Sequence, residues 1–226
     1  MPEPWSLAVF LDEMGPDLLK AVLETLYMVG LSTLFAVVLG VPLGVLLTVT
    51  DRGHVLESPG LARLLGSVVN TVRSVPFIIL VVALIPLTRL IVGTTIGPTA
   101  AVVSLTVAAT PFLARLVDGN LREVDPGVIQ AALVMGASPW QIVRKVLLPE
   151  ALPGLVHSAT VLVVNLVAYS AITGAVGAGG LGQLAINYGY YRYRGDVMIA
   201  TVILLVVIVQ ALQALGDRTV RALDRR

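Results

Sequence analysis

Residues that could support catalysis are few in this chain of 226 residues. The only lysines are Lys20 and Lys145, and neither follows a glycine, so a phosphate-binding loop of the form G-x-x-x-x-G-K-[ST] is absent. The histidines are His54 and His157, and neither H-E-x-x-H nor G-x-S-x-G occurs. The lack of cysteine excludes disulfides and thiolate metal sites. We therefore expect no catalytic residue, no metal and no cofactor on this chain; a partner subunit must use any ATP that drives it.

A glycine-rich run over residues 174–182 contains a literal G-x-G-x-x-G at Gly177, Gly179 and Gly182. The dinucleotide-binding fingerprint requires a strand before it and a βαβ unit around it. Here the run follows an apolar stretch long enough to cross a membrane. We interpret it as a bent, closely packed segment at the membrane exit.

A polar stripe lies within that apolar stretch. Asn165, Tyr169 and Thr173 are four residues apart, so they share one face of a helix. Polar groups inside a membrane need partners in protein or in a water-filled path. The stripe, with Ile172 beside it, either lines a transport pathway or its gate, or only bonds neighbouring helices.

Composition indicates that membrane helices position these residues. Hydrophobic residues make up 57% of the chain and charged residues 13%, with a mean hydropathy of +0.92. An average soluble domain has about 25% charged residues. A bilayer requires about 20 apolar residues per helix, and suitable stretches cover residues 26–49, 75–91, 99–117, 155–176 and 197–215. The predicted fold class is an all-α polytopic membrane protein with five transmembrane helices.

Prolines and glycines predict local features of these spans. Pro16 is expected to break any long helix before the first span, and residues 51–66 are expected to form a polar link after it. Pro76 and Pro86 predict bent or broken geometry in the second span. Small residues that permit close helix approach in the first span are Gly30, Gly40 and Gly44.

Between the third and fourth spans lies a long helical pattern that is neither a span nor a tail. Its apolar residues recur at i, i+3, i+4 and i+7, and Gly136 can close the helix in the left-handed conformation. Ser138 then restarts a helix as N-cap, with Pro139 at the first position and Gln141 completing a capping box. The second helix is expected to end before Pro149. The pattern predicts two short helices joined by a tight turn outside the bilayer.

This segment resembles the EAA loop of ABC importer permeases: Glu-Ala-Ala, three residues, Gly, nine residues, then Ile-x-Leu-Pro. The matching and adjoining residues here, named the coupling loop below, are Gln130, Ala131, Ala132, Gly136, Ala137, Ser138, Pro139, Val146, Leu148 and Pro149. Gln130 replaces the acidic residue and Val146 replaces Ile, so a family salt bridge at residue 130 is in doubt. The resemblance implies that this loop docks in a groove of a cytoplasmic ATPase and carries its motion into the membrane. The alternative is a helical hairpin that only links two spans.

The phrases at residues 73–80, 142–155 and 174–183 narrow the resemblance to permease subunits of bacterial methionine importers. It implies a homodimer, two cytoplasmic ATPase subunits, an extracytoplasmic substrate-binding lipoprotein and methionine as cargo, with the D-form left open beside the L-form. An importer for another amino acid or small organic solute is the alternative. A gradient-driven secondary transporter is disfavoured, because acidic residues avoid the core of every predicted span.

Five spans place the termini on opposite sides, and Lys and Arg indicate which side is cytoplasmic. With the C-terminus inside, the outer face keeps only Lys20, Arg89, Arg192 and Arg194, and the inner face receives the other Lys and Arg residues. We expect residues 1–20 to form an extracytoplasmic segment without a signal peptide, residues 21–215 the transmembrane domain, and residues 216–226 a cytoplasmic basic tail. The expected location is the bacterial inner membrane, with lipid and not nucleic acid as a further partner.

Overall fold

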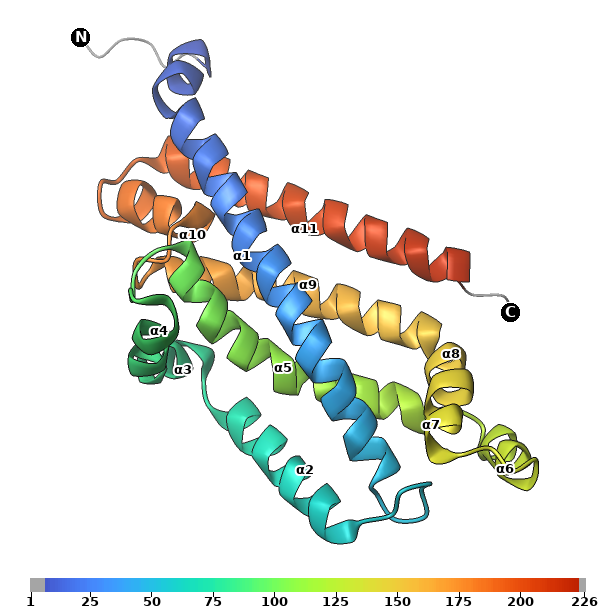
Figure 1. The fold of residues 1–226 in the computed structure, drawn as a ribbon. Helices are drawn as coiled ribbons and strands as arrows, with labels where there is room; N and C mark the ends of the chain where they lie inside the picture. Colours follow the sequence, from blue (N-terminus) through green and yellow to red (C-terminus); the bar gives the residue numbers. More distant parts are fainter. Residues whose placement is uncertain (1–6, 224–226) are drawn as a thin grey trace. The chain divides into compact units, whose positions relative to one another are not determined.

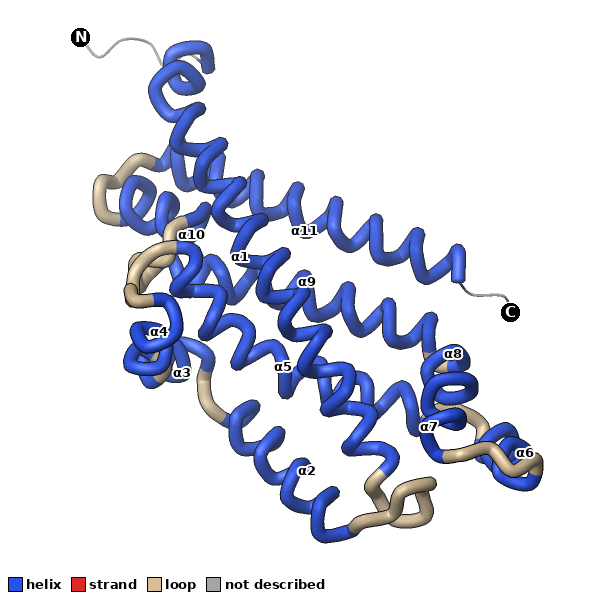
Figure 2. The backbone as a smooth tube through the Cα atoms, viewed as in Figure 1, coloured by secondary structure: helices blue, strands red, loops and turns tan. Residues whose placement is uncertain are grey.

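The computed structural model describes residues 7–223, which form helices joined by loops, with no strand in that range (Figures 1 and 2). Expectations for residues 1–6 and 224–226 lie outside the described residues. The elements in chain order are α1 (Leu7–Val49), α2 (Pro59–Ser74), α3 (Phe77–Ala83), α4 (Ile85–Val92), α5 (Pro98–Arg122), α6 (Pro126–Val134), α7 (Pro139–Ile142), the π-helix η1 (Val143–Leu147), α8 (Leu148–Glu150), α9 (Leu152–Gly174), α10 (Gly180–Leu184), the π-helix η2 (Ala185–Tyr190) and α11 (Gly195–Leu223).

Four helices are long and apolar enough to cross a membrane, and the predicted all-helical membrane class is confirmed. They are α1, α5, α9 and α11. A fifth span exists only if α2 and α3, which meet at a bend of 101°, count as one broken span. The prediction of one span over residues 75–91 is therefore corrected. That stretch is divided between α3 and α4, and at about 1.5 Å per residue neither reaches the 30 Å of a bilayer core.

The first helix begins earlier than expected. The prediction that Pro16 breaks it is wrong, since α1 is continuous from Leu7 to Val49, and the domain boundary expected at residue 20 falls inside it. Phe10, Met14 and Leu18 are buried in one apolar cluster. An interior proline costs about 3 kcal/mol, whereas each large apolar side chain contributes about 1.5–3 kcal/mol on burial. The buried stripe therefore outweighs the proline.

The link after α1 is shorter than expected. Residues 51–66 were predicted to be a polar link, but α2 already begins at Pro59. Val69 is buried with Leu47 and Ala114, and Leu65 packs against them. The packed apolar residues of α2 are spaced as in an amphipathic helix. The polar residues between them led to the prediction of a link.

Contacts divide the chain into two compact units. Unit 1 comprises Met1–Ser32, Phe77–Leu105 and Asn165–Ala211, and unit 2 comprises Thr33–Pro76, Thr106–Val164 and Leu212–Arg226. The core of unit 1 gathers the N-terminal part of α1 with α10 and the start of α11. The core of unit 2 gathers the end of α1 with α2 and α5.

Two of the three predicted glycine contacts occur in unit 2. A Cβ added at Gly44 would lie 2.6 Å from the Ala114 carbonyl oxygen, and one at Gly40 would lie 2.9 Å from the Thr110 carbonyl oxygen. Gly30 differs, since a Cβ there would meet nothing within 4 Å. Gly40 and Gly44 thus allow α1 to approach the α5 backbone, whereas the contact predicted at Gly30 is not found.

Candidate functional site

The turn of the coupling loop has the predicted geometry. Gly136 has φ +79°, its N–H donates to the Leu133 carbonyl at 2.9 Å, and the Ala137 N–H donates to the Ala132 carbonyl at 3.0 Å. This pair of bonds is a Schellman closure of α6, and it requires a residue that tolerates the left-handed region. Both ends of the turn are therefore fixed by local hydrogen bonds.

The next helix starts with the predicted capping box. The Ser138 hydroxyl accepts from the Gln141 N–H at 3.4 Å, and the Gln141 side-chain oxygen accepts from the Ser138 N–H at 2.8 Å. Pro139 occupies the first turn of α7, where a missing N–H costs nothing. The two short helices and the tight turn are confirmed as local structure.

The exit from the loop differs from the prediction. The second helix does not end before Pro149: α7 continues through the π-helical turn η1 into α8. The Leu148 N–H donates to the Val143 carbonyl, five residues back. Pro149 can donate no such bond and its ring crowds the preceding turn, so the wider π turn accommodates it.

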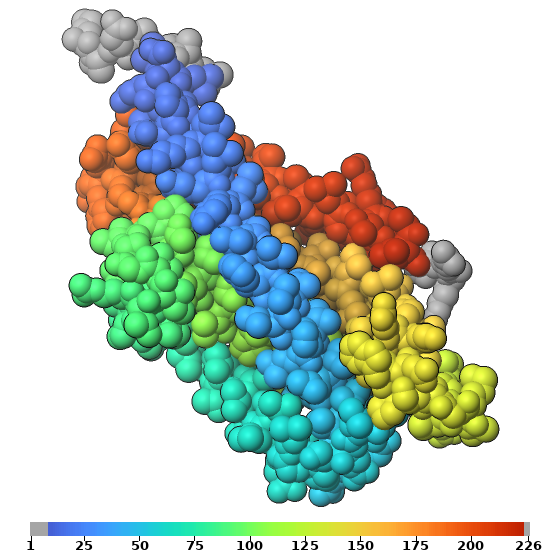
Figure 3. All heavy atoms as spheres, viewed as in Figure 1, coloured from blue at the N-terminus to red at the C-terminus, as the bar shows by residue number. Residues whose placement is uncertain are grey.

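The coupling loop buries some of its apolar side chains and exposes others. Ala132, Ile142 and Leu147 are buried. Val134, Met135 and Trp140 are 89%, 81% and 69% exposed, and α6 lies at the surface of the space-filling view (Figure 3). Exposed apolar side chains on a rigid turn are typical of a protein-binding surface. The remaining residues of the predicted motif divide in the same way: Gln130, Ala131, Gly136, Ser138 and Pro149 are exposed, and Ala137, Pro139, Val146 and Leu148 are half-buried.

The helices that enter and leave the loop are joined by Asn120. Its side-chain nitrogen lies 2.7 Å from the Ser158 hydroxyl and 3.2 Å from the Gly154 carbonyl of α9. A Cβ at Gly154 would lie 2.6 Å from the Asn120 side-chain oxygen, so a larger residue there would displace the Asn120 side chain. The loop is therefore held at its base by a bond between α5 and α9.

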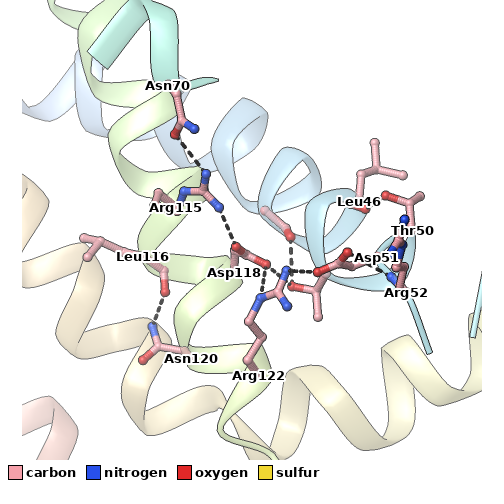
Figure 4. A network of polar contacts seen from close by, with 12 residues as sticks. Leu46, Thr50, Asp51, Arg52, Asn70, Arg115, Leu116, Asp118, Asn120 and Arg122 are labelled. Carbon is pink, nitrogen blue, oxygen red and sulfur yellow. Dashed lines mark hydrogen bonds and ion pairs between the residues drawn. The ribbon is translucent and has the colours of Figure 1, made fainter. Parts of the chain in front are cut away.

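A buried carboxylate ties the same end of α5 to α1. The side chain of Asp118, 4% exposed, accepts from Arg115 at 2.9 Å, from Arg122 at 2.9 Å and from the Thr48 hydroxyl at 3.0 Å (Figure 4). Arg115 also donates to Asn70 of α2 at 2.8 Å. Since these three groups all donate to Asp118, the charge is satisfied at low exposure. The network connects three helices of unit 2.

Arg122 extends the network to the loop after α1. Its guanidinium lies 2.8 Å from Asp51, as Figure 4 shows. The Arg52 backbone N–H and the Arg122 guanidinium hold the pKa of the Asp51 carboxyl below its usual range. In unit 1, Arg194 pairs with Glu13 at 2.6 Å and with Asp196 at 2.7 Å, and these carboxylates raise its pKa.

The side chains of the predicted polar stripe of α9 differ in their contacts and in their burial. Tyr169 stacks on Phe77 with ring centroids 4.3 Å apart and planes 9° from parallel. Thr173 is fully buried and donates to the Ser170 carbonyl at 2.7 Å, whereas Ile172 is 39% exposed and Asn165 is half-buried. Thr173 also lines a pocket of about 110 Å³, well below the 300–1,000 Å³ that is usual for small-molecule sites.

The glycine-rich run is the bent, closely packed segment that was predicted. Gly179 and Gly180 have φ of +89° and +74°, and the Gly180 N–H donates to the Glu24 carboxylate at 2.7 Å. A Cβ at Gly182 would collide with the Ala171 backbone. The element before the run is the helix α9 rather than a strand, which differs from the context that the dinucleotide fingerprint requires.

A family model now identifies the class of this membrane protein. The model for binding-protein-dependent transport system inner membrane components matches residues 40–226. The chain belongs to this family. It is therefore an ABC transport permease, and it contains the coupling loop within the matched region.

Individual permeases support the same assignment. The probable D-methionine transport system permease protein MetI of Vibrio cholerae is 54% identical over 209 residues, covering 92% of this chain and 93% of the relative. MetI of Escherichia coli K12, a D-methionine transport system permease protein, is 54% identical over 157 residues, covering 70% and 72%.

Solved structures share the permease fold. A structure of inward-facing conformations of the MetNI methionine ABC transporter has a TM-score of 0.93 and 53% identity, over 95% of this chain and 99% of that chain. An amino acid ABC transporter solved with histidines has a TM-score of 0.78 at 19% identity, covering 97% and 100%, which shows a shared fold alone.

The Asp118 network was not predicted from the sequence of this permease. The expected third span ended at residue 117, one residue before Asp118. The signal was the spacing of Arg115, Asp118 and Arg122, which places three charges on one helix face. Their burial depends on Thr48 and Asn70, which lie 70 and 45 residues away from their partners.

Proposed function

We propose that this permease forms the pathway for methionine in an ATP-driven importer of the bacterial inner membrane. The observation that carries the proposal is the identity of 54% across 92% of the chain with a probable D-methionine permease. The local geometry of the coupling loop supports an energy-coupling role, since its rigid turn presents exposed apolar side chains. ATP hydrolysis is assigned to a separate ATPase.

The proposed assembly contains two copies of this chain, two cytoplasmic ATPase subunits and an extracytoplasmic substrate-binding lipoprotein. The N-terminus lies outside and the C-terminus inside, so the coupling loop meets the ATPase. The excess of Lys and Arg on one side of the spans supports this orientation. Residues 1–20 are then extracytoplasmic and residues 216–226 cytoplasmic.

The proposed mechanism is alternating access. ATP binding closes the ATPase dimer, the grooves carry the coupling loops with them, and α9 and α11 tilt to open the path outward. Asn120 and the Asp118 network are suited to transmit this motion, because they hold the base of the loop to the neighbouring helices. Cargo that has entered the pathway would pass to the cytoplasm when the ATPase dimer reopens.

The polar stripe is proposed to border the pathway or its gate. The Phe77–Tyr169 stack supports this role, because it holds an aromatic ring of α9 in one orientation. Exposed Ile172 lies on the following turn, beside Asn165 and Thr173 on the same helix. Replacement of Tyr169 by Ala should change uptake more than replacement by Phe, which keeps the stack.

The decisive experiment is co-purification of the tagged chain from its native membrane, followed by an ATPase assay with and without methionine. An associated ATPase that responds to methionine supports both class and cargo. An ATPase indifferent to methionine but responsive to another amino acid contradicts the cargo. No ATPase from gently solubilised membranes contradicts the proposed mechanism.

Gly136 offers a separate test of coupling. Valine is β-branched and strained at φ +79°, whereas asparagine tolerates this region. We expect Gly136→Val, like the bulkier Gly136→Trp, to abolish ATP-dependent uptake while membrane insertion persists, and Gly136→Asn to retain most of it. Wild-type uptake by Gly136→Val would remove the coupling role from this turn.

A further inference from the structure

A basic pocket lies in unit 2 where α1 ends. It has a volume of about 240 Å³. Its walls come from the end of α1, the first turns of α2 and the last turns of α5; the lining side chains used below are Arg52, Arg63, Gly66, Arg115 and Arg122. Arg115 and Arg122 also belong to the Asp118 network, whereas Arg52, Arg63 and the space between them have no role in the proposed mechanism.

The charges of the pocket do not balance. Four arginines line it, and the carboxylates that pair with them are those of Asp51 and Asp118. Four positive and two negative groups leave a net charge of +2. Among the described ion pairs, none involves Arg52 or Arg63.

The pocket is also built to accept an anion. Arg115 and Arg122 are held in place by Asp118, so their guanidinium groups are oriented before any ligand arrives. The Ser58 side chain does not cap α2, and no acidic residue lies in the first turn of this helix, where Pro59 and Ala62 line the pocket. A Cβ at Gly66 would meet nothing within 4 Å, which leaves the space beside the arginines open.

The pocket lies at the end of an apolar helix. The apolar run of α1 ends at Val49, directly before the pocket residues Asp51 and Arg52. The arginines therefore lie at the boundary between hydrocarbon and water, where lipid phosphates are found.

We infer that this pocket binds the phosphate of an anionic phospholipid. Guanidinium groups recognise phosphate oxygens in pairs, and basic pockets between membrane helices bind anionic headgroups. Free phosphate shares this chemistry but has no acyl chains to hold it at the hydrocarbon boundary where α1 ends. In the proposed orientation the lipid belongs to the inner leaflet; the rest of the inference needs neither methionine nor the ATPase.

The test compares lipid retention by the full chain, purified with its associated subunits. Native mass spectrometry measures phosphatidylglycerol against phosphatidylcholine retained from mixed bilayers. We expect wild type to retain phosphatidylglycerol selectively, and Arg52→Gln and Arg63→Gln each to weaken retention about fivefold, at about 1 kcal/mol per arginine. Gly66→Trp should abolish it by filling the pocket with all arginines present.

Arg73→Gln is the matched control. It removes the same charge from the last turn of the same helix but lies outside the pocket. Equal retention by wild type, Arg63→Gln and Gly66→Trp would overturn the inference, as would an equal loss in Arg73→Gln. Stabilisation against heat by inorganic phosphate, with no selective lipid retention, would overturn lipid as the source. None of these readouts involves cargo or ATP, so failure here is distinguishable from failure of the proposed function.

Discussion

At the scale of single residues, Asp118 has the largest role outside the coupling loop. Its carboxylate is almost fully buried and joins Thr48 of α1 to Arg115 and Arg122 of α5. Through Arg115 and Asn70 it also reaches α2. One short side chain therefore fixes three helices near the base of the coupling loop.

We expect Asp118→Asn to destabilise the protein. Bonds to a charged group contribute about 1.5–3 kcal/mol each, but Arg115 and Arg122 are 35% and 41% exposed and can return to water. After that discount we expect a loss of about 2 kcal/mol, which lowers Tm by about 4–8 °C. Thermal unfolding in detergent measures it, with Glu123→Gln, an exposed carboxylate near the end of α5, as control. Equal Tm values for the two variants would mean that burial of Asp118 is unimportant.

Asp51 predicts a pH dependence of known sign. Its carboxyl has a lowered pKa in the folded protein, first from the Arg52 N–H and then from Arg122. Its stabilisation is therefore present above the unfolded pKa of about 3.9 and is lost as pH falls through the folded pKa. The Tm difference between wild type and Asp51→Asn should be small, given partial exposure, and should shrink from pH 6 to pH 3.5. A difference that grew in acid would contradict the assignment.

At the scale of elements, contact between α1 and α5 depends on two glycines. Gly40 and Gly44 lie four residues apart on α1, and an added Cβ at either would meet backbone oxygen of α5. Because association in lipid depends on close packing rather than on hydrophobicity, such small residues determine how near two helices lie. The third glycine of the same helix, Gly30, has open space instead.

Gly44→Ala and Gly30→Ala form a matched pair. Overpacking costs about 1–3 kcal/mol, and the neighbours of Gly44 are a carbonyl oxygen and Val117 at 2.6 Å, which cannot move aside cheaply. We expect Gly44→Ala to lower Tm by several degrees and Gly30→Ala to leave it unchanged or higher, since alanine is the better helix former. Thermal unfolding of both variants in the same detergent checks this. Similar losses would show that helix approach is not the cause.

At the scale of the whole molecule, orientation is the property with the clearest test. The chain has no cysteine, so single cysteines can be introduced without background. Tyr191 lies before α11 and Arg221 in its last turn, and both side chains are exposed. They lie at opposite ends of α11, which is long enough to cross the membrane.

A membrane-impermeant maleimide should label Tyr191→Cys in intact spheroplasts and Arg221→Cys only after permeabilisation. This result follows from the proposed outside N-terminus and inside C-terminus. The reverse pattern would invert the orientation and place the coupling loop away from the ATPase. Uptake by both variants serves as the check that the chain is correctly assembled.

Features that depend on neighbouring residues could be predicted from the sequence alone. The membrane class follows from long apolar stretches, because a bilayer demands a fixed length of apolar helix. The turn at Gly136 and the capping box of Ser138 and Gln141 were predictable, since their bonds join residues at most five apart. The two short helices of this loop and the turn between them were predictable for this reason.

Features whose partners are distant in sequence could not be predicted and are seen only in the folded chain. Pro16 is tolerated because its helix buries an apolar stripe against α10 and α11, and Gly30 and Gly44 differ because only one faces another helix. Asp118 is buried because Thr48, 70 residues earlier, meets it. Burial and close approach are sums over contacts from separate segments, and a local pattern does not contain them.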